Sequence, residues 1–432
     1  MGRRATSAIV PDSQSGEAIH RLIYDWNQGA RAWQPACRGV ELNDETLRDG
    51  LQSPSVQNPT VEQKIELLHL METLGINGAN IGYPGASAQA MADVVALARE
   101  IDRARLRLRP NCAARTHEAD IRPIAEAQQR SGVAITASVF LGSSPIRQLV
   151  EGWDLHRLLC TTEQAVTLAV RLGLEVMYVT EDTTRARPEH LERLYRTAIE
   201  SGATRVCVAD TVGHATPWGA QRTVRFIRRV IDRTGVPVKL DYHGHRDRGL
   251  DVINSLAALQ AGADRVHGCA LGIGERAGNT SMDLLLVNLQ LLGWINRDLS
   301  RLPDYVRVAS EATGTPIPCN YPVIGKDAFE TSTGVHAAAI AKARQRGDTW
   351  LADRVYSSVP AAMVGRRQVI SVGPMSGQSN VACWLADHQL EATPERVRKV
   401  LRYAKSAGRV LTDDEVRGIV EETTGTTPKE PA

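Results

Sequence analysis

Aromatic side chains are scarce in this chain of 432 residues: they make up 4% of it, with only three phenylalanines. No aromatic stripe is therefore available to stack on sugars or nucleic-acid bases. The seven cysteines are odd in number and include no Cys-x-x-Cys pair. This pattern argues against a disulfide framework and indicates a reducing compartment.

An excess of one charge and long apolar runs are also absent. The 51 basic and 49 acidic residues leave a formal net charge of +2, so no basic surface for nucleic acid or anionic lipid is predicted. No run approaches the roughly 18 apolar residues of a transmembrane helix, and no signal peptide is recognisable at the start. We therefore predict a cytoplasmic protein with neither a membrane nor a nucleic acid as partner.

From about residue 39, short β-branched apolar runs alternate with helical patterns, which is typical of βα units and a parallel sheet. The eight predicted strands are Gly39–Leu42, Gly78–Ile81, Leu106–Cys112, Val133–Phe140, Glu175–Val179, Arg205–Ala209, Val236–Tyr242 and Arg265–Ala270. Eight consecutive units predict an α/β fold of the (β/α)₈ TIM-barrel type. The alternative, an open doubly wound sheet, requires a glycine-rich turn after its first strand, and none is present.

The βα rhythm stops near residue 300, so we predict a barrel over residues 39–300. Residues 301–432 are predicted to form a helical C-terminal subdomain, with no separate regulatory domain after it. Its expected helices are Tyr305–Ala312, Gly334–Gln345, Pro394–Ser406 and Asp413–Glu422. Residues 1–38 are predicted to be an N-terminal extension with one helix near Glu17–Trp26.

Residues that end barrel strands surround one mouth, where active sites lie. His243 and His245 are two residues apart in predicted strand seven, so both imidazoles point to one face. With a carboxylate they suit a divalent metal, although a lone His-x-His is more often two partly exposed histidines. The acidic run Asp44-Glu-Thr-Leu-Arg48-Asp49 at the end of strand one favours the metal interpretation.

Three segments together resemble a known family. They are Asp44-Glu-Thr-Leu-Arg-Asp-Gly-Leu-Gln52, His243-Gly-His245 and Gly272-Ile-Gly-Glu-Arg-Ala-Gly-Asn279. In this order they look like the motifs of the DRE-TIM metallolyases, and most like the synthase branch of 2-isopropylmalate, homocitrate and citramalate synthases. Phe329–His336 and Val372–Asn380 are similar to later family segments, so the resemblance spans roughly residues 39–400.

The resemblance implies a divalent-metal-dependent, Claisen-type condensation of acetyl-CoA, the co-substrate, with a 2-oxo acid. It implies one metal ion (Mn, Mg, Zn and Co are not distinguished) held by Asp49, His243, His245 and, as a fourth ligand, Asn279. Arg48 would hold a developing oxyanion, and the implied base and proton donor are Glu181, His336 and Tyr356. The simpler interpretations are a structural salt bridge of Arg48 with Asp49 or Asp44, a solvent-facing His336 and a packed Tyr356.

Thr211 and Arg115 are the expected contacts to the substrate's anionic groups. Three neighbouring positions depart from the family pattern: Asn80 stands where Glu or Gln is usual, Arg147 where a histidine is usual, and Arg246 where an asparagine is usual. Together with Arg115 and Arg185 they form a cationic set suited to anion capture. We therefore predict a 2-oxo acid with a second anionic group, a dicarboxylate or a phosphonate. The alternative is that these arginines pair with Asp182 and Asp247.

Two other functions are compatible with these motifs. One is lyase or aldolase cleavage on the same barrel, as in 3-hydroxy-3-methylglutaryl-CoA lyases, and the other is a non-catalytic barrel. The Gly272–Asn279 loop and the long C-terminal segment favour the synthase, and the intact polar motifs argue against a non-catalytic barrel. We also expect a homodimer in which this segment supplies His336 and Tyr356 to a neighbouring subunit.

Overall fold

The structure is a computed structural model that describes residues 22–27, 33–36 and 39–424. The helix expected near Glu17–Trp26 lies mostly outside these residues. Within the described ranges, no helix has the length and apolar character needed to cross a membrane. The six described cysteines are free thiols, and Cys112, Cys207 and Cys269 are buried. These three act as small apolar side chains of the barrel.

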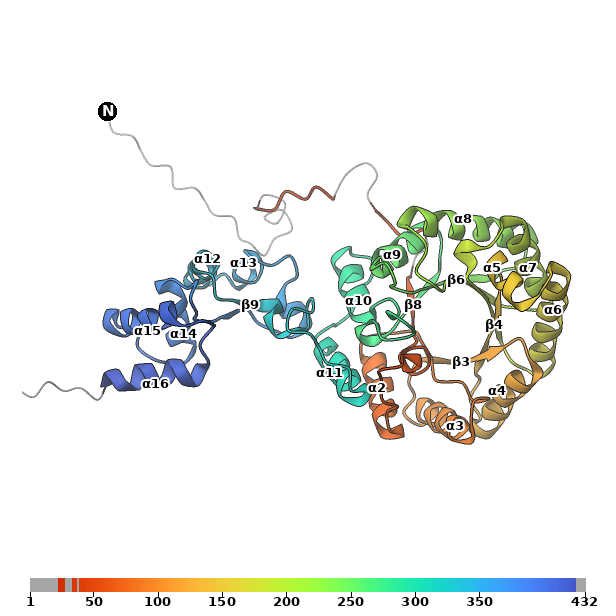
Figure 1. The fold of residues 1–432 in the computed structure, drawn as a ribbon, viewed down its shortest axis with the longest axis horizontal. Helices are drawn as coiled ribbons and strands as arrows, with labels where there is room; N and C mark the ends of the chain where they lie inside the picture. Colours follow the sequence, from red (N-terminus) through yellow and green to blue (C-terminus); the bar gives the residue numbers. More distant parts are fainter. Residues whose placement is uncertain (1–21, 28–32, 37–38, 425–432) are drawn as a thin grey trace, which may run out of the picture. The chain divides into compact units, whose positions relative to one another are not determined.

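Eight parallel strands close into a barrel, so the predicted (β/α)₈ fold is confirmed. Figure 1 shows the strands as a ring inside the helices. The strands are β1 (Glu41–Asp44), β2 (Gly78–Asn80), β3 (Arg109–Arg115), β4 (Thr136–Gly142), β5 (Val176–Glu181), β6 (Arg205–Asp210), β7 (Lys239–Gly244) and β8 (Arg265–Gly268). Several begin and end later than predicted, because the backbone ladder continues through the polar residues at the mouth, which an apolar pattern does not reveal.

The barrel's outer layer consists of helices that follow the strands in the chain. They are α2 (Val61–Thr73), α3 (Ala88–Arg103), α4 (Glu118–Ser131), α6 (Leu155–Arg171), α7 (Pro188–Glu200), α8 (Pro217–Thr234), α9 (Asp251–Ala261) and α10 (Met282–Leu291). In α8, the Thr216 side chain accepts from the Gly219 amide at the start, and Gly235 ends the helix at a φ of 68°. Both are favoured helix boundaries.

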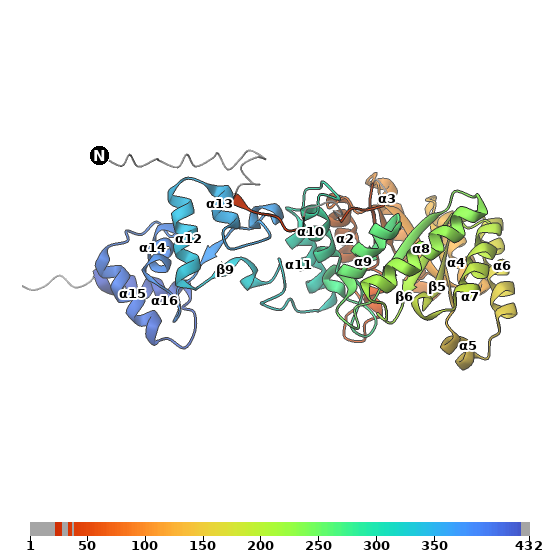
Figure 2. The ribbon, with the colours of Figure 1, turned by 90° about the horizontal axis from the view of Figure 1, so that it is seen from above.

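A short helix at the mouth of the barrel was not predicted. α5 (Pro145–Glu151) follows β4 and projects from one end of the barrel in Figure 2. The Ser144 side chain caps its first turn and Gly152 ends it. None of its residues is buried, although Ile146, Leu149 and Val150 have helical spacing. The helix has only seven residues, which is too few to establish a helical period in a sequence.

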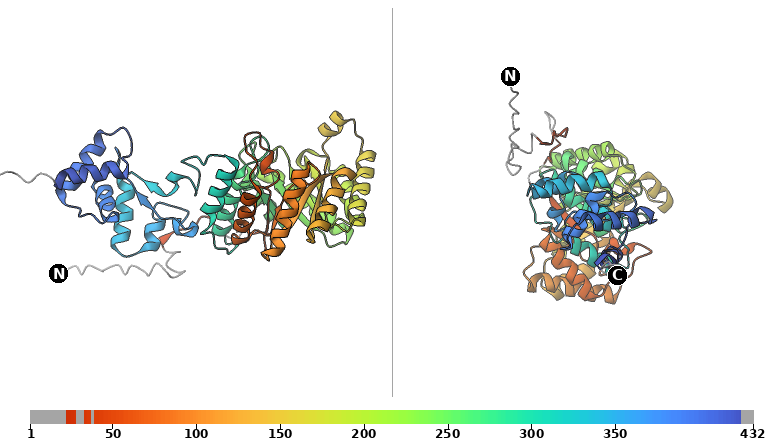
Figure 3. Two further views of the ribbon diagram at one scale, coloured as in Figure 1. Left: turned by 90° about the horizontal axis from the view of Figure 1, so that it is seen from below. Right: turned by 90° about the vertical axis from the view of Figure 1, so that its left-hand side faces the viewer.

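The chain from Pro318 onwards forms a second compact unit. Its helices are α12 (Gly334–Gln345), α13 (Thr349–Arg354), α14 (Gln378–Asp387), α15 (Pro394–Ser406) and α16 (Asp413–Thr424), and its two short parallel strands are β9 (Glu330–Thr331) and β10 (Val369–Ile370). α14, α15 and α16 are the dark blue helices that lie together in Figure 3. Their shared core includes Val381, Trp384 and Val400. α13 and α14 were not predicted.

α11 (Leu302–Thr313) belongs to the barrel unit, which extends to Ile317 and not only to the predicted boundary near residue 300. It packs on α2. The buried Tyr305 donates its hydroxyl to the carboxylate of Asp44 at the end of β1. This polar contact joins a helix beyond the eighth unit to the first strand.

Every second residue of a barrel strand points inward. On β7 and β8 these inward residues include charged side chains and histidines. Below the mouth, the buried carboxylate of Asp241 on β7 lies 2.5 Å from Arg205 Nη1 and 2.7 Å from Arg265 Nη2. Two and four residues further along the chain are His243 and His245. The strand alternation therefore places an ion-pair layer in the barrel and the candidate site directly above it.

Candidate active site

Three predicted metal ligands converge at the mouth of the barrel, where Asp49 follows β1 and the two histidines come from the end of β7. Asp49 Oδ2 lies 3.4 Å from His243 Nε2 and 3.9 Å from His245 Nε2. The two Nε2 atoms are 3.2 Å apart. Ligand atoms each about 2.1 Å from one ion lie about 3–3.5 Å from one another. The three buried side chains have nearly this spacing.

Atoms beside the three ligands test whether a cation fits. Asn279 Nδ2 donates to Asp49 Oδ1 and to the Ile273 carbonyl, both at 3.1 Å, whereas its buried Oδ1 has no partner among the described residues. Burial and the adjacent His243 lower the pKa of His245 to about 4, so this ring is neutral and able to be a ligand. Two imidazoles, a carboxylate and an unpartnered amide oxygen are a donor set that fits a divalent cation.

The glycines of the loop after β8 let Asn279 approach Asp49. Gly274 has a φ of 146°, and a Cβ there would lie 2.0 Å from Asn279 Nδ2. At Gly278 a Cβ would lie 1.9 Å from the Gly272 carbonyl oxygen. The spacing of glycines in Gly272–Asn279 therefore has a steric reason.

Arg48 lies between two carboxylates. Its Nη2 donates to Glu45 Oε2 at 2.5 Å, and its Nη1 lies 3.0 Å from Asp49 Oδ2. Its Nε is buried without an acceptor in the described part of the chain. The structure thus contains the salt bridge with Asp49 that the sequence allowed, and Nε is the guanidinium nitrogen that lacks a partner within the described ranges.

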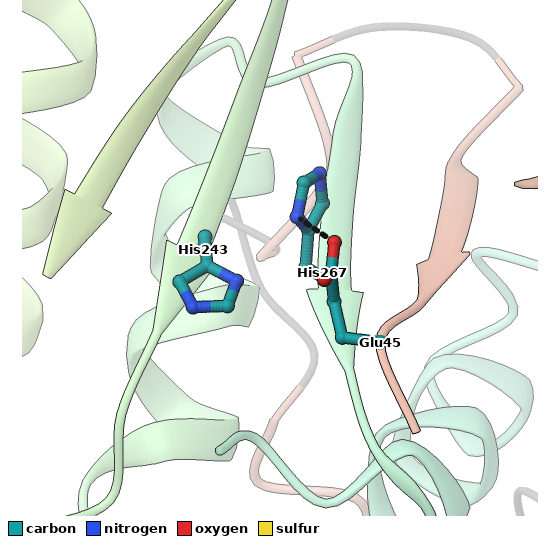
Figure 4. A group of neighbouring side chains, drawn as sticks. All are labelled: Glu45, His243 and His267. Atoms are coloured by element: carbon teal, nitrogen blue, oxygen red, sulfur yellow. Dashed lines mark ion pairs between the residues drawn. The ribbon is translucent and has the colours of Figure 1, made fainter. Parts of the chain in front are cut away.

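Glu45 and His267 are site residues that sequence reasoning missed. Figure 4 shows His267 of β8 facing Glu45, with His243 of β7 beside them. His267 Nδ1 lies 3.2 Å from Glu45 Oε1, and its Nε2 lies 2.9 Å from Asp241 Oδ2. The period of two that paired His243 with His245 also points Arg265 and His267 inward. That signal was available in the sequence.

The cavity above the candidate ligands has a volume of about 330 Å³. Predicted site residues among its lining are Asn80, Glu181 and Thr211, besides Arg48, Asp49, His243 and His245. Burial raises the pKa of Glu181, which the nearby Arg147 and Arg48 partly counteract. Thr211 Oγ1 accepts from the Asp182 amide at 2.8 Å, which leaves its hydroxyl proton to donate. Glu45 holds the Asn80 amide at 2.9 Å.

Arg115 and Arg147 line an adjoining hollow of about 450 Å³. This hollow shares Phe140 and Glu181 with the cavity. Arg115 pairs with Asp120 at 2.6 Å, and Arg147 lies 3.2 Å from Glu151. Arg157, which sequence reasoning did not single out, lines the same hollow and lies over the Trp153 ring.

Two arginines of the predicted cationic set are engaged by the protein itself. Arg185 binds both carboxylate oxygens of Asp182 at 2.7 Å. Arg246 donates to the Leu271 carbonyl and the Ser281 hydroxyl, both at 3.2 Å. The pairing alternative is therefore right for Arg185, and Arg246 is held inside the loop after β8. Neither residue lines the cavity or the adjoining hollow.

The second unit brings His336 and Tyr356 together. His336 is in the first turn of α12, and Tyr356 follows α13. Their rings stack with centroids 3.9 Å apart, and Tyr356 is 47% exposed. The two side chains thus form an accessible pair within their own unit.

Replacing His243 by alanine is expected to abolish stoichiometric binding of a divalent metal, because the remaining ligands would leave the ion one imidazole short. Metal analysis after dialysis measures this directly. His156→Ala on the exposed surface of α6 is the matched control and should retain the metal. Unchanged stoichiometry in His243→Ala would refute the assignment.

Known proteins are similar to this chain in sequence or in fold. The HMGL-like family model matches residues 39–308. Homocitrate synthase AksA of Methanopyrus kandleri is 34% identical, covering 89% of this chain and 94% of that protein. A putative (R)-citramalate synthase of Archaeoglobus fulgidus is 29% identical, covering 88% of this chain and 75% of that protein. The crystal structure of HMG-CoA lyase from Bacillus subtilis has a TM-score of 0.55 at 21% identity, covering 66% of this chain and 97% of the lyase.

These likenesses confirm the family that the three sequence motifs predicted. The match covers the whole barrel with its mouth, and the similarity to synthases extends well into the second unit. The lyase likeness concerns the barrel fold alone. The chain therefore belongs to the HMGL-like family, as an enzyme of the synthase type.

Proposed function

We propose that this enzyme condenses acetyl-CoA with a 2-oxo acid in a divalent-metal-dependent, Claisen-type reaction. Water then hydrolyses the thioester of the product, which gives a 2-hydroxy acid and free CoA. The proposal rests on one observation: a single cavity is lined by Arg48, Asp49, His243 and His245. The naming of relatives as homocitrate, 2-isopropylmalate and citramalate synthases supports the same reaction.

A divalent cation held by Asp49, His243, His245 and Asn279 would polarise the keto group of the acid and fix its orientation. Arg48, which lines the cavity, is suited to bind the oxygen on which negative charge develops as the keto carbon is attacked. The Thr211 hydroxyl is placed to donate to the acid's carboxylate.

Proton removal from the acetyl methyl group requires a positioned base. Glu181 is suited to this because burial raises its pKa, which makes its carboxylate a stronger base. We assign the stacked His336 and Tyr356 to proton transfer in the same reaction. Because they lie in the second unit, we further propose a homodimer in which they serve the partner's cavity. The expected compartment is the cytoplasm.

We also propose that the 2-oxo acid carries a second anionic group. Arg185 and Arg246 no longer support this, but Arg147 does. Its Nε is buried without a partner in the described part of the chain, and its charge already acts on Glu181. Arg115, Arg147 and Arg157 line the hollow that adjoins the cavity at Glu181. Arg115 is bound by both carboxylate oxygens of Asp120, as Arg185 is by those of Asp182. A distal carboxylate or phosphonate that extends from the cavity would therefore meet Arg147 and Arg157.

The test is release of free CoA from acetyl-CoA with a panel of 2-oxo acids in the presence of Mn²⁺ or Mg²⁺. We expect oxaloacetate, 2-oxoglutarate or a phosphonate analogue to give the highest kcat/KM, and Arg147→Ala to lower it at least tenfold for that acid alone. Arg122→Ala, an exposed arginine on α4, is the control.

A higher kcat/KM with 2-oxoisovalerate than with every dianionic acid would refute the second anionic group. No CoA release with any acid, together with cleavage of a 3-hydroxyacyl-CoA, would instead assign the lyase reaction.

A further inference from the structure

We infer that the buried ion pair of Glu45 with His267 positions the guanidinium of Arg48. Glu45 and His267, which share the cavity with Arg48, are thus assigned as positioning residues that act through Arg48. The inference rests on the proposed function for the role of Arg48. The contacts that carry it lie entirely within the barrel unit.

Both carboxylate oxygens of Glu45 are fully engaged by neighbouring side chains. Its Oε2 accepts from Arg48 Nη2 at 2.5 Å and from Asn80 Nδ2 at 2.9 Å. Its Oε1 accepts from Asn43 Nδ2 at 2.8 Å and lies 3.2 Å from His267 Nδ1. A carboxylate accepts about four hydrogen bonds, so Glu45 has no freedom to turn. It is 1% exposed, and the charges and hydrogen bonds around it outweigh burial and lower its pKa to about 2.

His267 fixes Glu45 from inside the barrel. The ring is 2% exposed and uses both nitrogens, with Nε2 2.9 Å from Asp241 Oδ2. Asp241 in turn is held by Arg205 and Arg265 of the ion-pair layer. A continuous line of charge-assisted contacts therefore runs from β6, β7 and β8 to Glu45, and these contacts are stronger than neutral hydrogen bonds.

The residue that this network positions is Arg48, which contacts two carboxylates. Asp49 is a candidate metal ligand, so its charge is shared with the cation. Glu45 is not one of the predicted metal ligands, and it holds Nη2 of Arg48. With Nη2 and Nη1 both occupied, the plane of the guanidinium is set beside the cavity that Arg48 lines. Without Glu45, Arg48 would depend on a carboxylate already committed to the metal.

Glu45, His243 and His267 also have ligand atoms close enough together to hold a second metal ion. The hydrogen bonds argue against this use. A metal between Glu45 and His267 would have to replace the contact that joins them, while Glu45 keeps three amide and guanidinium donors. The pair is accordingly assigned to positioning, and metal stoichiometry distinguishes the two uses.

A double-mutant cycle on the full-length, metal-loaded enzyme tests the inference. Glu45→Gln is expected to lower kcat by about 10²-fold, as a misplaced group does, with KM for the 2-oxo acid changed less than about threefold and one metal ion per chain retained. In an Arg48→Ala background, the same substitution should cost almost nothing further, because residues that act as a unit are not additive. His267→Gln should show the same coupling with a smaller loss, and it carries the test if Glu45→Gln does not fold.

Asp44→Asn is the matched control. Asp44 is an equally buried carboxylate at the end of the same strand, but it contacts Thr46 and Tyr305 instead of Arg48. Any loss it causes should be the same with and without Arg48. An equal loss for Glu45→Gln in both backgrounds would overturn the inference. So would two metal ions in the wild type falling to one in Glu45→Gln.

Failure of the proposed function has a different signature. In that case the wild type releases no CoA with any 2-oxo acid. The cycle is then measured through the affinity of the Mn²⁺-loaded protein for pyruvate by calorimetry, which needs no turnover. Additive effects of Glu45→Gln and Arg48→Ala on that affinity would overturn the positioning role by itself.

Discussion

Replacing Arg48 by lysine is expected to lower kcat by about 10²–10³-fold, the usual cost of losing one donor to a developing oxyanion. The physical reason is geometric. Arg48 uses two of its nitrogens to hold Glu45 and Asp49 while it lines the cavity. A lysine ammonium is a point charge that cannot span both carboxylates and keep a fixed orientation beside the cavity.

The measurement is steady-state kinetics of CoA release together with metal content and circular dichroism. Metal stoichiometry and secondary structure should be unchanged, since neither needs the guanidinium. Arg185→Lys is the control, because Arg185 also pairs with a carboxylate near the mouth but does not line the cavity. A kcat for Arg48→Lys within threefold of the wild type would show that Arg48 serves only as a salt bridge.

Replacing His336 by alanine is expected to lower kcat by about 10²–10⁴-fold, the range typical of a lost general acid or base. The second expectation concerns which chain supplies it. Mixing an Arg48→Ala chain with a His336→Ala chain should restore activity if the second unit serves the partner's cavity. Random pairing in a closed homodimer then leaves about a quarter of all sites with both residues intact.

The mixed sample is assayed after subunit exchange under mild denaturant, next to each variant treated alone. The stacking partner gives a further variant, Tyr356→Phe, which removes the hydroxyl and keeps the ring contact with His336. Activity that stays at the level of the separate variants after proven exchange would mean that His336 acts within its own chain. A fully active His336→Ala enzyme would remove the residue from the mechanism.

The barrel and its family were predictable because both depend on short-range patterns. The alternation of apolar strands with helices that begin at residues such as Thr216 and end at glycines such as Gly235 specifies βα units one after another. Eight such units close into a barrel. The motif around Asp49, the His243–His245 pair and the glycine loop to Asn279 follow directly from residue order.

Prediction from short sequence segments failed where an element is very short or where its contacts join residues far apart in the chain. α5 was missed because its seven residues are too few to establish a helical period, and α11 was assigned to the second unit because its contact with Asp44 joins residues far apart in the chain. His267 was missed although its inward direction followed from strand alternation, because a histidine on a barrel strand has no meaning until its neighbours across the barrel are known.

The sequence by itself determined the barrel, the family and the residue types at its mouth. These follow from the periodicity of apolar residues and from motifs of consecutive residues. Only the tertiary structure decided which charged groups are partners. It paired Arg185 with Asp182, gave Arg48 both Glu45 and Asp49, and set Arg157 beside Arg147 and Arg115. The reason is that an ion pair depends on distances between side chains from different strands, and those distances exist only once the barrel has closed.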